Sequence, residues 1–254
     1  MPQEFVILTY ARTGSNWLVH CLNYHPDILC HYELYHPARI YDGWGEKSQT
    51  ACSHGIFARV GRNVAPVRFF KQIVKQSAPV RAVGFKLFVV PMHNRRMFDY
   101  VMAHQEIKKI LLIRKNPIKN YISLLIAQET GVWNSLTGSH QQQIQVVADY
   151  TKFLKHAEQR KQRYQTIVQT LNNEQVSYYE LSYEDLIGKS ETLLQIHEFL
   201  DVHRHTASVR QESKYQKQNS EDLRTSIANY GEFARSIRGT EYESYLAGSL
   251  QQEE

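Results

Sequence analysis

The chain has 254 residues, of which 42% are hydrophobic and 22% charged, and its formal net charge is +5 at pH 7. This composition is that of a soluble globular protein, and its modest basic excess suits an anionic ligand without predicting nucleic-acid binding. The apolar run at residues 5–8 is too short for a signal peptide, no stretch is long enough to span a membrane, and three cysteines do not make a disulfide framework. We therefore expect a cytoplasmic protein with no membrane span and a single domain over residues 1–254.

The hydrophobic pattern predicts short strands that alternate with helices. Strands are predicted at residues 5–9, 80–90, 110–113 and 177–181. Helices are predicted at residues 14–24, 117–129, 141–171 and 191–200. Such alternation indicates an α/β fold of three layers, with a mostly parallel central sheet flanked by helices. In these sheets ligands bind beyond the carboxyl ends of the strands.

The turn at residues 9–17 follows the first predicted strand and opens the first predicted helix. Its backbone N–H groups and the positive end of the helix dipole suit a phosphate, Arg12 adds a positive charge, and Thr13, Ser15 and Asn16 add donors. The turn is not a Walker A loop, because it lacks the first Gly and the Gly-Lys pair of G-x-x-x-x-G-K-[ST]. From these residues alone, a plain strand–turn–helix connection is an equally good interpretation.

The sequence TYARTGSNWL resembles the phosphosulfate-binding loop of the sulfotransferase family, whose commonest cytosolic form is T-Y-P-K-S-G-T-T-W. The resemblance implies a P-loop-like α/β fold that uses 3′-phosphoadenosine 5′-phosphosulfate (PAPS), releases 3′-phosphoadenosine 5′-phosphate and needs no metal. By this resemblance, the 5′-phosphosulfate is held by Arg12, Thr13, Gly14, Ser15 and Asn16, with Trp17 closing the pocket beneath.

A second segment, RKNPIKNYIS, begins at Arg114 and ends at Ser123. It resembles the 3′-phosphate site of the family, a strand followed by R-N-P with a serine eight residues after the arginine. Aligning Asn-Pro places Lys115 where the family has its arginine, so Arg114 is favoured as the ligand and Lys115 stays open. The alternative for this segment alone is a helix that begins at a proline, with solvated charges at its start.

Three further segments resemble parts of the same family. GFKLF, with Lys86, resembles a central strand whose lysine contacts the bridging sulfate region, and YEDL, from Tyr183, resembles a helix cap. The segment from Lys214 resembles the C-terminal part of bacterial members, where Lys214 or Lys217 would reach the 3′-phosphate. A solvated surface charge is the alternative for either lysine.

The general base is expected to be Glu33. In cytosolic phenol and steroid sulfotransferases the base is a histidine two residues after the strand lysine, and that position holds Phe88. Glu33, in HYELYHP, resembles the base of carbohydrate- and trehalose-directed members, although it could instead cap a helix or pair with an arginine. The other candidates are His31, His36 and His93.

The sequence therefore predicts transfer of a sulfuryl group from PAPS to a hydroxyl of a carbohydrate or other small alcohol. Arg12 and Lys86 would stabilise the charge of the group in transfer. Aromatic side chains that could form a platform for the acceptor are Tyr32, Tyr35, Tyr41 and Trp44. A kinase with an atypical P-loop and a non-catalytic phosphate- or nucleic-acid-binding module are the alternatives. No metal site is expected from the spacing of Cys and His, and a homo-oligomer is left open.

Overall fold

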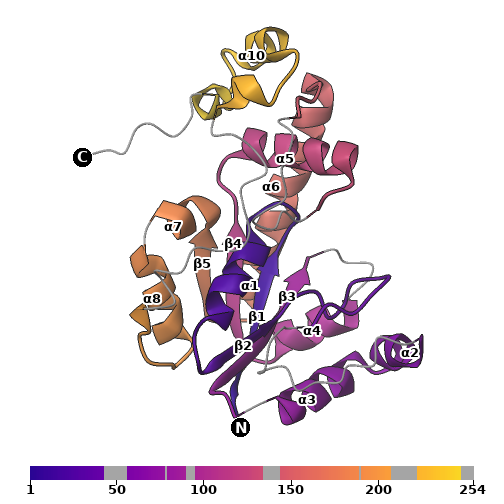
Figure 1. The fold of residues 1–254 in the computed structure, drawn as a ribbon, viewed down its shortest axis with the longest axis vertical. Coiled ribbons are helices and arrows are strands. Elements are labelled where there is room, and N and C mark those ends of the chain that lie inside the picture. The colour runs from indigo at the N-terminus through magenta and orange to yellow at the C-terminus, as the bar shows by residue number, and fades with distance from the viewer. Residues whose placement is uncertain are drawn as a thin grey trace. The chain divides into compact units, whose positions relative to one another are not determined.

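The computed structural model describes residues 1–42, 56–77, 79–89, 95–133, 144–188, 190–206 and 222–246 (Figure 1). The chain divides into two compact units. The first unit is Met1–Ile113 with Val168–Ser213, and the second unit is Arg114–Ile167 with Lys214–Glu254. A single domain over residues 1–254 stays a prediction.

The first unit is built on a five-stranded sheet in which every neighbouring pair of strands is parallel, in the order β2-β3-β1-β4-β5. Its strands are β1 (Gln3–Thr9), β2 (Ile28–His31), β3 (Ala82–Phe88), β4 (Lys108–Ile113) and β5 (Tyr178–Ser182). The central strand β1 pairs on both sides, with Thr9 opposite Phe88 in β3 and opposite Leu112 in β4. The carboxyl ends of these three strands therefore meet at one edge, and the predicted parallel sheet is confirmed.

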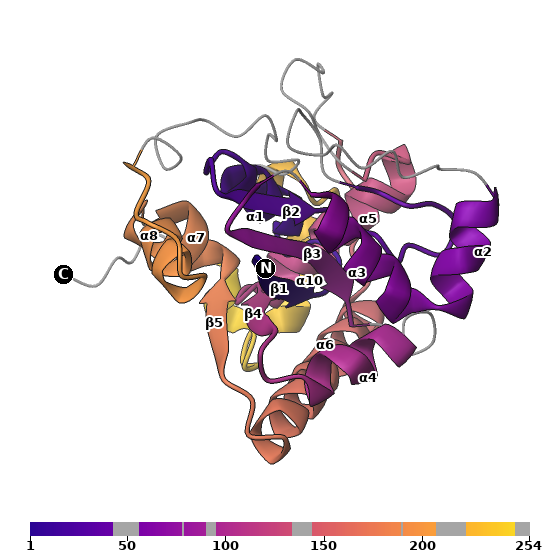
Figure 2. The same ribbon diagram turned by 90° about the horizontal axis from the view of Figure 1, so that it is seen from below.

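Helices cover both faces of this sheet. They are α1 (Ser15–Asn23), α2 (Ile56–Val64), α3 (Pro66–Gln76), α4 (Arg95–Ala103), α7 (Tyr183–Gly188) and α8 (Ser190–Phe199). Figure 2 shows α1, α7 and α8 on one side of the strands and α3 and α4 on the other. The predicted arrangement of three layers is confirmed.

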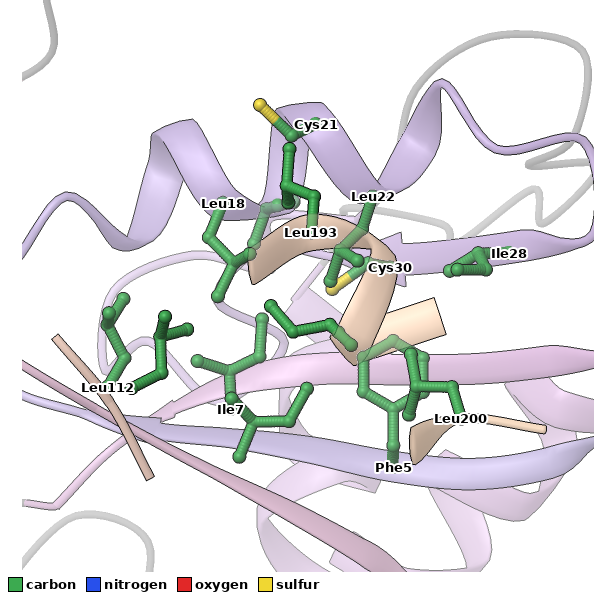
Figure 3. Close-up of a cluster of buried hydrophobic side chains, with 14 of the residues drawn as sticks. Phe5, Ile7, Leu18, Cys21, Leu22, Ile28, Cys30, Leu112, Leu193 and Leu200 are labelled. Carbon is green, nitrogen blue, oxygen red and sulfur yellow. The ribbon is translucent and has the colours of Figure 1, made fainter. Parts of the chain in front are cut away.

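The apolar core between α1, α8 and the sheet follows from two sequence periods. Leu18 and Leu22 lie one turn apart on α1, and Phe5 and Ile7 alternate along β1, so all four side chains enter the same cluster. Leu193 of α8 closes this cluster from the other helix (Figure 3). Each fully buried leucine, isoleucine or phenylalanine contributes about 1.5–3 kcal/mol relative to an exposed one. This packing fixes α1, and with it the loop that precedes α1.

Aromatic side chains fill the opposite face of the sheet. Phe85 of β3 packs against Phe70 of α3, with ring centroids 4.8 Å apart, and against Tyr35, with centroids 5.3 Å apart. Both distances lie in the range of favourable aromatic pairs. The chain that follows β2 is thus packed onto the sheet close to the strand that carries Lys86.

The second unit is helical in its described residues. Its elements are α5 (Pro117–Thr130), the part of α6 (Tyr150–Asn173) up to Ile167, α10 (Tyr230–Ile237) and two short 3₁₀ helices, Leu223–Thr225 and Glu243–Tyr245. Its core contains Ile118, Ile122, Phe153, Phe233 and Ile237. Helix α5 begins as predicted, because the Asn116 side chain accepts a hydrogen bond from the Lys119 N–H at 2.8 Å and Pro117 occupies the first turn.

The predicted helix over residues 141–171 is wrong at its start, since α6 begins at Tyr150. Residues 141–143 lie outside the described residues. Val146 instead forms a parallel bridge with Ile227, and the Asp149 side chain accepts from the Lys152 N–H at 2.8 Å, which caps the helix. Val147, an apolar residue within the predicted range, is 71% exposed.

Candidate active site

The loop between β1 and α1 has an unusual backbone. Arg12 has φ of 66° and Gly14 has φ of 78°, both in the left-handed region. The first N–H groups of a helix have no carbonyl partner within that helix, and they carry the positive end of its dipole. The loop therefore leads into a helix start that suits an anion, as the sequence predicts.

Gly14 is required by its surroundings as well as by its φ angle. A Cβ atom at this position would lie 2.3 Å from Cδ2 of Tyr183, so the ring of Tyr183 occupies the space of a side chain. Tyr183 begins the YEDL segment, whose Asp185 N–H donates to Ser182 Oγ at 3.0 Å, in agreement with the expected cap at the start of α7. Tyr183 has a second role that the sequence did not predict, because it shapes the candidate anion loop.

Thr13 turns its hydroxyl into the protein. Its Oγ1 donates to the carbonyl of Tyr10 at 3.0 Å and lies 2.5 Å from Oγ1 of Thr9, which donates to the carbonyl of Leu112 at 3.0 Å. The side chain of Thr13 is fully buried. Thr13 thus ties the loop to β1 and β4, and any contact it makes with an anion would come from its backbone.

Lys86 is the centre of the candidate site. Its ammonium group lies 2.9 Å from Oε1 of Glu33, donates to Oδ1 of Asn16, and lies 4.8 Å from the ring centroid of Phe88. The side chain of Lys86 is 2% exposed and that of Glu33 is 19% exposed. Burial lowers the pKa of Lys86, the Glu33 carboxylate acts against that shift, and the charge of Arg12 adds to it.

Three predicted site residues therefore meet from three different elements. Asn16 comes from α1, Lys86 from β3, and Glu33 from the chain that follows β2. Of the interpretations left open for Glu33, ion pairing is observed, but with a lysine rather than an arginine. A carboxylate with partial exposure beside a buried cation can accept a proton from a bound hydroxyl. The cation can stabilise negative charge that develops next to it.

The remaining residues of the loop differ in their burial. Ser15 is buried in the first turn of α1, and Trp17 is half-buried and packs against the core of the first unit. Arg12 is half-buried.

The alternative bases are less well placed than Glu33. His31 is fully buried, and burial lowers its pKa to about 4, which keeps the ring neutral at pH 7. His36 accepts a hydrogen bond at Nδ1 from the Ala38 N–H at 3.2 Å, and its ring packs against Tyr41 with centroids 5.2 Å apart. His93 lies outside the described residues.

The predicted 3′-phosphate residues belong to the second unit. Arg114 is half-buried and Lys115 is exposed, and the carbonyl of Arg114 accepts from Nη2 of Arg160 at 3.1 Å. Ser123 is buried on α5. Asn116, the asparagine of the family's R-N-P, has structural partners as the cap of α5 and as a donor to the carbonyl of Tyr245 at 3.2 Å. Lys214 and Lys217 lie outside the described residues.

One buried residue near the site was missed by sequence reasoning. Arg62 of α2 is 1% exposed and donates hydrogen bonds to backbone carbonyls just after Glu33. The sequence IFARVGRNV gives no signal for this role, because an arginine on a helix is most often at the surface.

Within the described ranges, no group of three or more His, Cys, Asp or Glu side chains is arranged to hold a metal ion. Among the helices described, none is long and apolar enough to cross a membrane.

No protein-family model matches the chain. It is similar to nodulation protein H of Rhizobium tropici, with 25% identity over 249 residues, which cover 96% of this chain and 93% of that protein. It is also similar to nodulation protein H of Rhizobium meliloti strain 1021, with 29% identity over 134 residues, 52% of this chain and 50% of that protein. Among solved structures, a sulfotransferase from Alicyclobacillus acidocaldarius aligns with a TM-score of 0.47 and 16% identity, covering 97% of this chain and 95% of that one.

Proposed function

We propose that this chain, a bacterial-type member of the PAPS-dependent sulfotransferase family, transfers a sulfuryl group from PAPS to a hydroxyl of a carbohydrate or other small alcohol, with Glu33 as the general base. The observation that carries the proposal is the contact of Lys86 with both Glu33 and Asn16. This contact joins a cation, a candidate base and the candidate anion loop in one place.

PAPS supplies the activated sulfuryl group, and the residues of the loop fit such an anion. The left-handed backbone at Arg12 and Gly14 and the start of α1 favour negative charge, and this loop lacks the Gly-Lys pair of a Walker A loop. By the family resemblance, the loop from Arg12 to Trp17 holds the 5′-phosphosulfate. Arg114 and Ser123 hold the 3′-phosphate, with Lys115, Lys214 and Lys217 as further candidates.

Different residues of the site have different roles in the proposed reaction. Glu33 takes the proton from the acceptor hydroxyl, a role typically worth ~10²–10⁴-fold in rate. Lys86 and Arg12 balance the negative charge that builds up during transfer. The partial exposure of Glu33, against the near-complete burial of Lys86, suits this division, because the base must reach an acceptor that enters from solvent.

The acceptor class rests on the base and on one aromatic side chain. Glu33 stands in for the histidine that phenol- and steroid-directed members carry where this chain has Phe88. Tyr35 is buried and Tyr32 packs on the core, whereas Tyr41 is 41% exposed and donates its backbone N–H to the carbonyl of Glu33 at 3.1 Å. Tyr41 is therefore the described aromatic best suited to meet a sugar ring, and Trp44 lies outside the described residues.

Calorimetry with 3′-phosphoadenosine 5′-phosphate, ADP and AMP in parallel tests the donor. We expect binding of the first nucleotide at micromolar concentration, in the absence of magnesium, and no comparable binding of the other two. Equal affinity for all three, or turnover that needs magnesium and ATP, would favour the kinase alternative. Steeply salt-dependent binding of DNA or RNA would favour the nucleic-acid-binding module.

The Glu33→Gln variant tests the base separately from the donor. We expect turnover with PAPS and a panel of sugars and small alcohols to fall by ~10²–10⁴-fold, while affinity for 3′-phosphoadenosine 5′-phosphate stays close to that of the wild type. Wild-type turnover in this variant would remove Glu33 from the mechanism and leave the donor assignment intact.

A further inference from the structure

We propose that Arg62 is a positioning residue for catalysis, which holds the loop after β2 so that Glu33 stays on Lys86. This inference rests on the proposed role of Glu33 as the general base. Arg62 acts through the backbone that carries Glu33, because its hydrogen bonds run to the carbonyls of Leu34, His36 and Arg39.

The contacts of Arg62 are concentrated on the residues that follow Glu33. Its Nη1 donates to the carbonyls of Leu34 at 3.0 Å, His36 at 2.8 Å and Arg39 at 2.9 Å. The two N–H groups of one nitrogen are thus shared among three carbonyl oxygens within residues 34–39 of the same loop. A guanidinium group keeps its charge at neutral pH, although burial lowers the pKa of Arg62.

The loop that follows Glu33 contains neither helix nor strand in its described residues, so regular backbone hydrogen bonding does not hold it in place. The carbonyl of Glu33 accepts from the N–H groups of His36, at 3.2 Å, and Tyr41, at 3.1 Å, which closes a compact turn rather than a helix or strand. A buried carbonyl left without a donor costs about 1–3 kcal/mol. Removing Arg62 would therefore release several carbonyls at once, next to the base.

Helix α2 buries the charged side chain of Arg62 and exposes two valines, which is the reverse of the usual pattern in surface helices. Arg62 is 1% exposed, whereas Val60 is 52% exposed and Val64 is 67% exposed on the same short helix. Burying the valines and exposing the arginine would favour stability, because a buried arginine has to lose its hydration. Helix α2 thus places Arg62, rather than Val60 or Val64, inside the protein, as expected for a residue kept for function.

Two neighbouring side chains support the same loop. Nη1 of Arg59, also on α2, donates to the carbonyl of Ala38 at 2.7 Å. The Tyr35 hydroxyl donates to the carbonyl of Pro66, at the start of α3, at 2.8 Å. Helices α2 and α3 therefore hold the loop through Arg59, Arg62 and the carbonyl of Pro66, and Arg62 makes the most of these hydrogen bonds.

Displacement of a catalytic group by about 1 Å can lower a rate ~10²-fold. We therefore expect Arg62→Met to lower kcat by about 10- to 100-fold, because the 2.9 Å contact between Lys86 and Glu33 is no longer held. Affinity for 3′-phosphoadenosine 5′-phosphate should stay near that of the wild type, because Arg62 lies on a different element from the anion loop.

Two further variants separate positioning from stability. Lys109→Met is the matched control, since Lys109 is a fully buried cation on β4 whose ammonium group donates to the carbonyl of His104 rather than to the loop. We expect it to lower the melting temperature without lowering kcat. Arg62→Lys should give an intermediate kcat, because the lysine nitrogen ends one bond short of Nη1 yet can donate to the same carbonyls.

A double-mutant cycle gives the decisive test. If Arg62 acts through Glu33, adding Arg62→Met to Glu33→Gln should not lower the residual turnover further. Additive losses, or a wild-type kcat in Arg62→Met, would overturn the positioning role. Should Arg62→Met fail to fold, Arg62→Lys replaces it in the cycle with the same two criteria. Wild-type turnover in Glu33→Gln alone would instead overturn the proposed base, so the two proposals fail by different results.

Discussion

The ammonium group of Lys86 lies 2.9 Å from the carboxylate of Glu33, and the lysine side chain is almost completely buried. Removing one member of a buried ion pair leaves the other charge buried without a partner. The loss of stability is then larger than the net contribution of the intact pair. The proposed cation and the proposed base therefore depend on each other for their charge state and position.

Lys86→Met should lower kcat by ~10²–10³-fold, because it removes the cation that stabilises charge in the transition state. Lys109→Met provides the control. Lys109 is an equally buried lysine on β4, whose ammonium group donates to the carbonyl of His104, and burial lowers its pKa to about 8. Steady-state kinetics and melting curves of both variants check the prediction, which fails if the two lose kcat alike.

Gly14→Ala should weaken binding of 3′-phosphoadenosine 5′-phosphate by about tenfold or more, because the free loop would relax away from the left-handed conformation. Binding would have to restore that conformation at a cost of ~1–2 kcal/mol, and 1.4 kcal/mol is a factor of ten. The new methyl group would also meet the ring of Tyr183. Adding Tyr183→Ala should restore only part of the affinity, because the φ of 78° remains. Gly61→Ala, where no atom of the described residues lies within 4 Å of the added Cβ, should bind normally in the same titration.

The sequence predicted the anion loop from an apolar strand, a glycine-containing turn and a helix in succession, whereas Lys86 and Glu33 were named through the family resemblance. It placed these residues at one site only through that resemblance, since β2 and β3 pair only in three dimensions and β2, four residues long, was missed. Thr13 shows a second limit. Its residue type suggested a hydroxyl ligand, but its hydroxyl bonds to Thr9 and Tyr10.

Arg62 shows why part of the site was beyond sequence reasoning. Its contacts beyond its own helix are with backbone carbonyls, which any sequence possesses, so no partner residue type marks them. The start of α6 was missed for a related reason. The apolar pattern near Val146 serves a bridge to Ile227, far along the chain, rather than a helix face.

Asn116→Ala should lower stability by about 1 kcal/mol through loss of the cap of α5. Asn116→Asp keeps the oxygen that accepts from the Lys119 N–H and loses only the donor to the carbonyl of Tyr245, so it should be less destabilised. Chemical denaturation measures both variants. Equal destabilisation would show that the contact with Tyr245, and not the cap, is what matters.

The free energy of unfolding should decrease as pH falls from about 6.5 to 4. In this range the histidines of the unfolded chain bind protons, whereas the buried histidines of the folded protein resist protonation. Burial lowers the pKa of His31 and of His197 to about 4, and the charges of His25 and its neighbours add to the shift at His197. Their stabilising contribution is therefore complete above the unfolded pKa and is lost as pH falls toward the folded value.

Melting curves across this pH range check the prediction for the histidines. His197→Asn should flatten the dependence, because it removes one of the groups that must charge on unfolding in acid. A variant with the same slope as the wild type would show that other groups control the acid transition.

The position of β1 at the centre of the sheet has a consequence for folding. Phe5 of β1 pairs with Gly84 on one side and with Lys108 on the other, and no strand of the sheet is joined to its neighbour by a hairpin. Contacts between residues so far apart in sequence slow folding, because long loops must close before the pairing is gained. During synthesis the apolar β1 emerges well before either partner strand. We therefore expect refolding to be slow and sensitive to protein concentration, with aggregation competing until β3 and β4 dock onto β1.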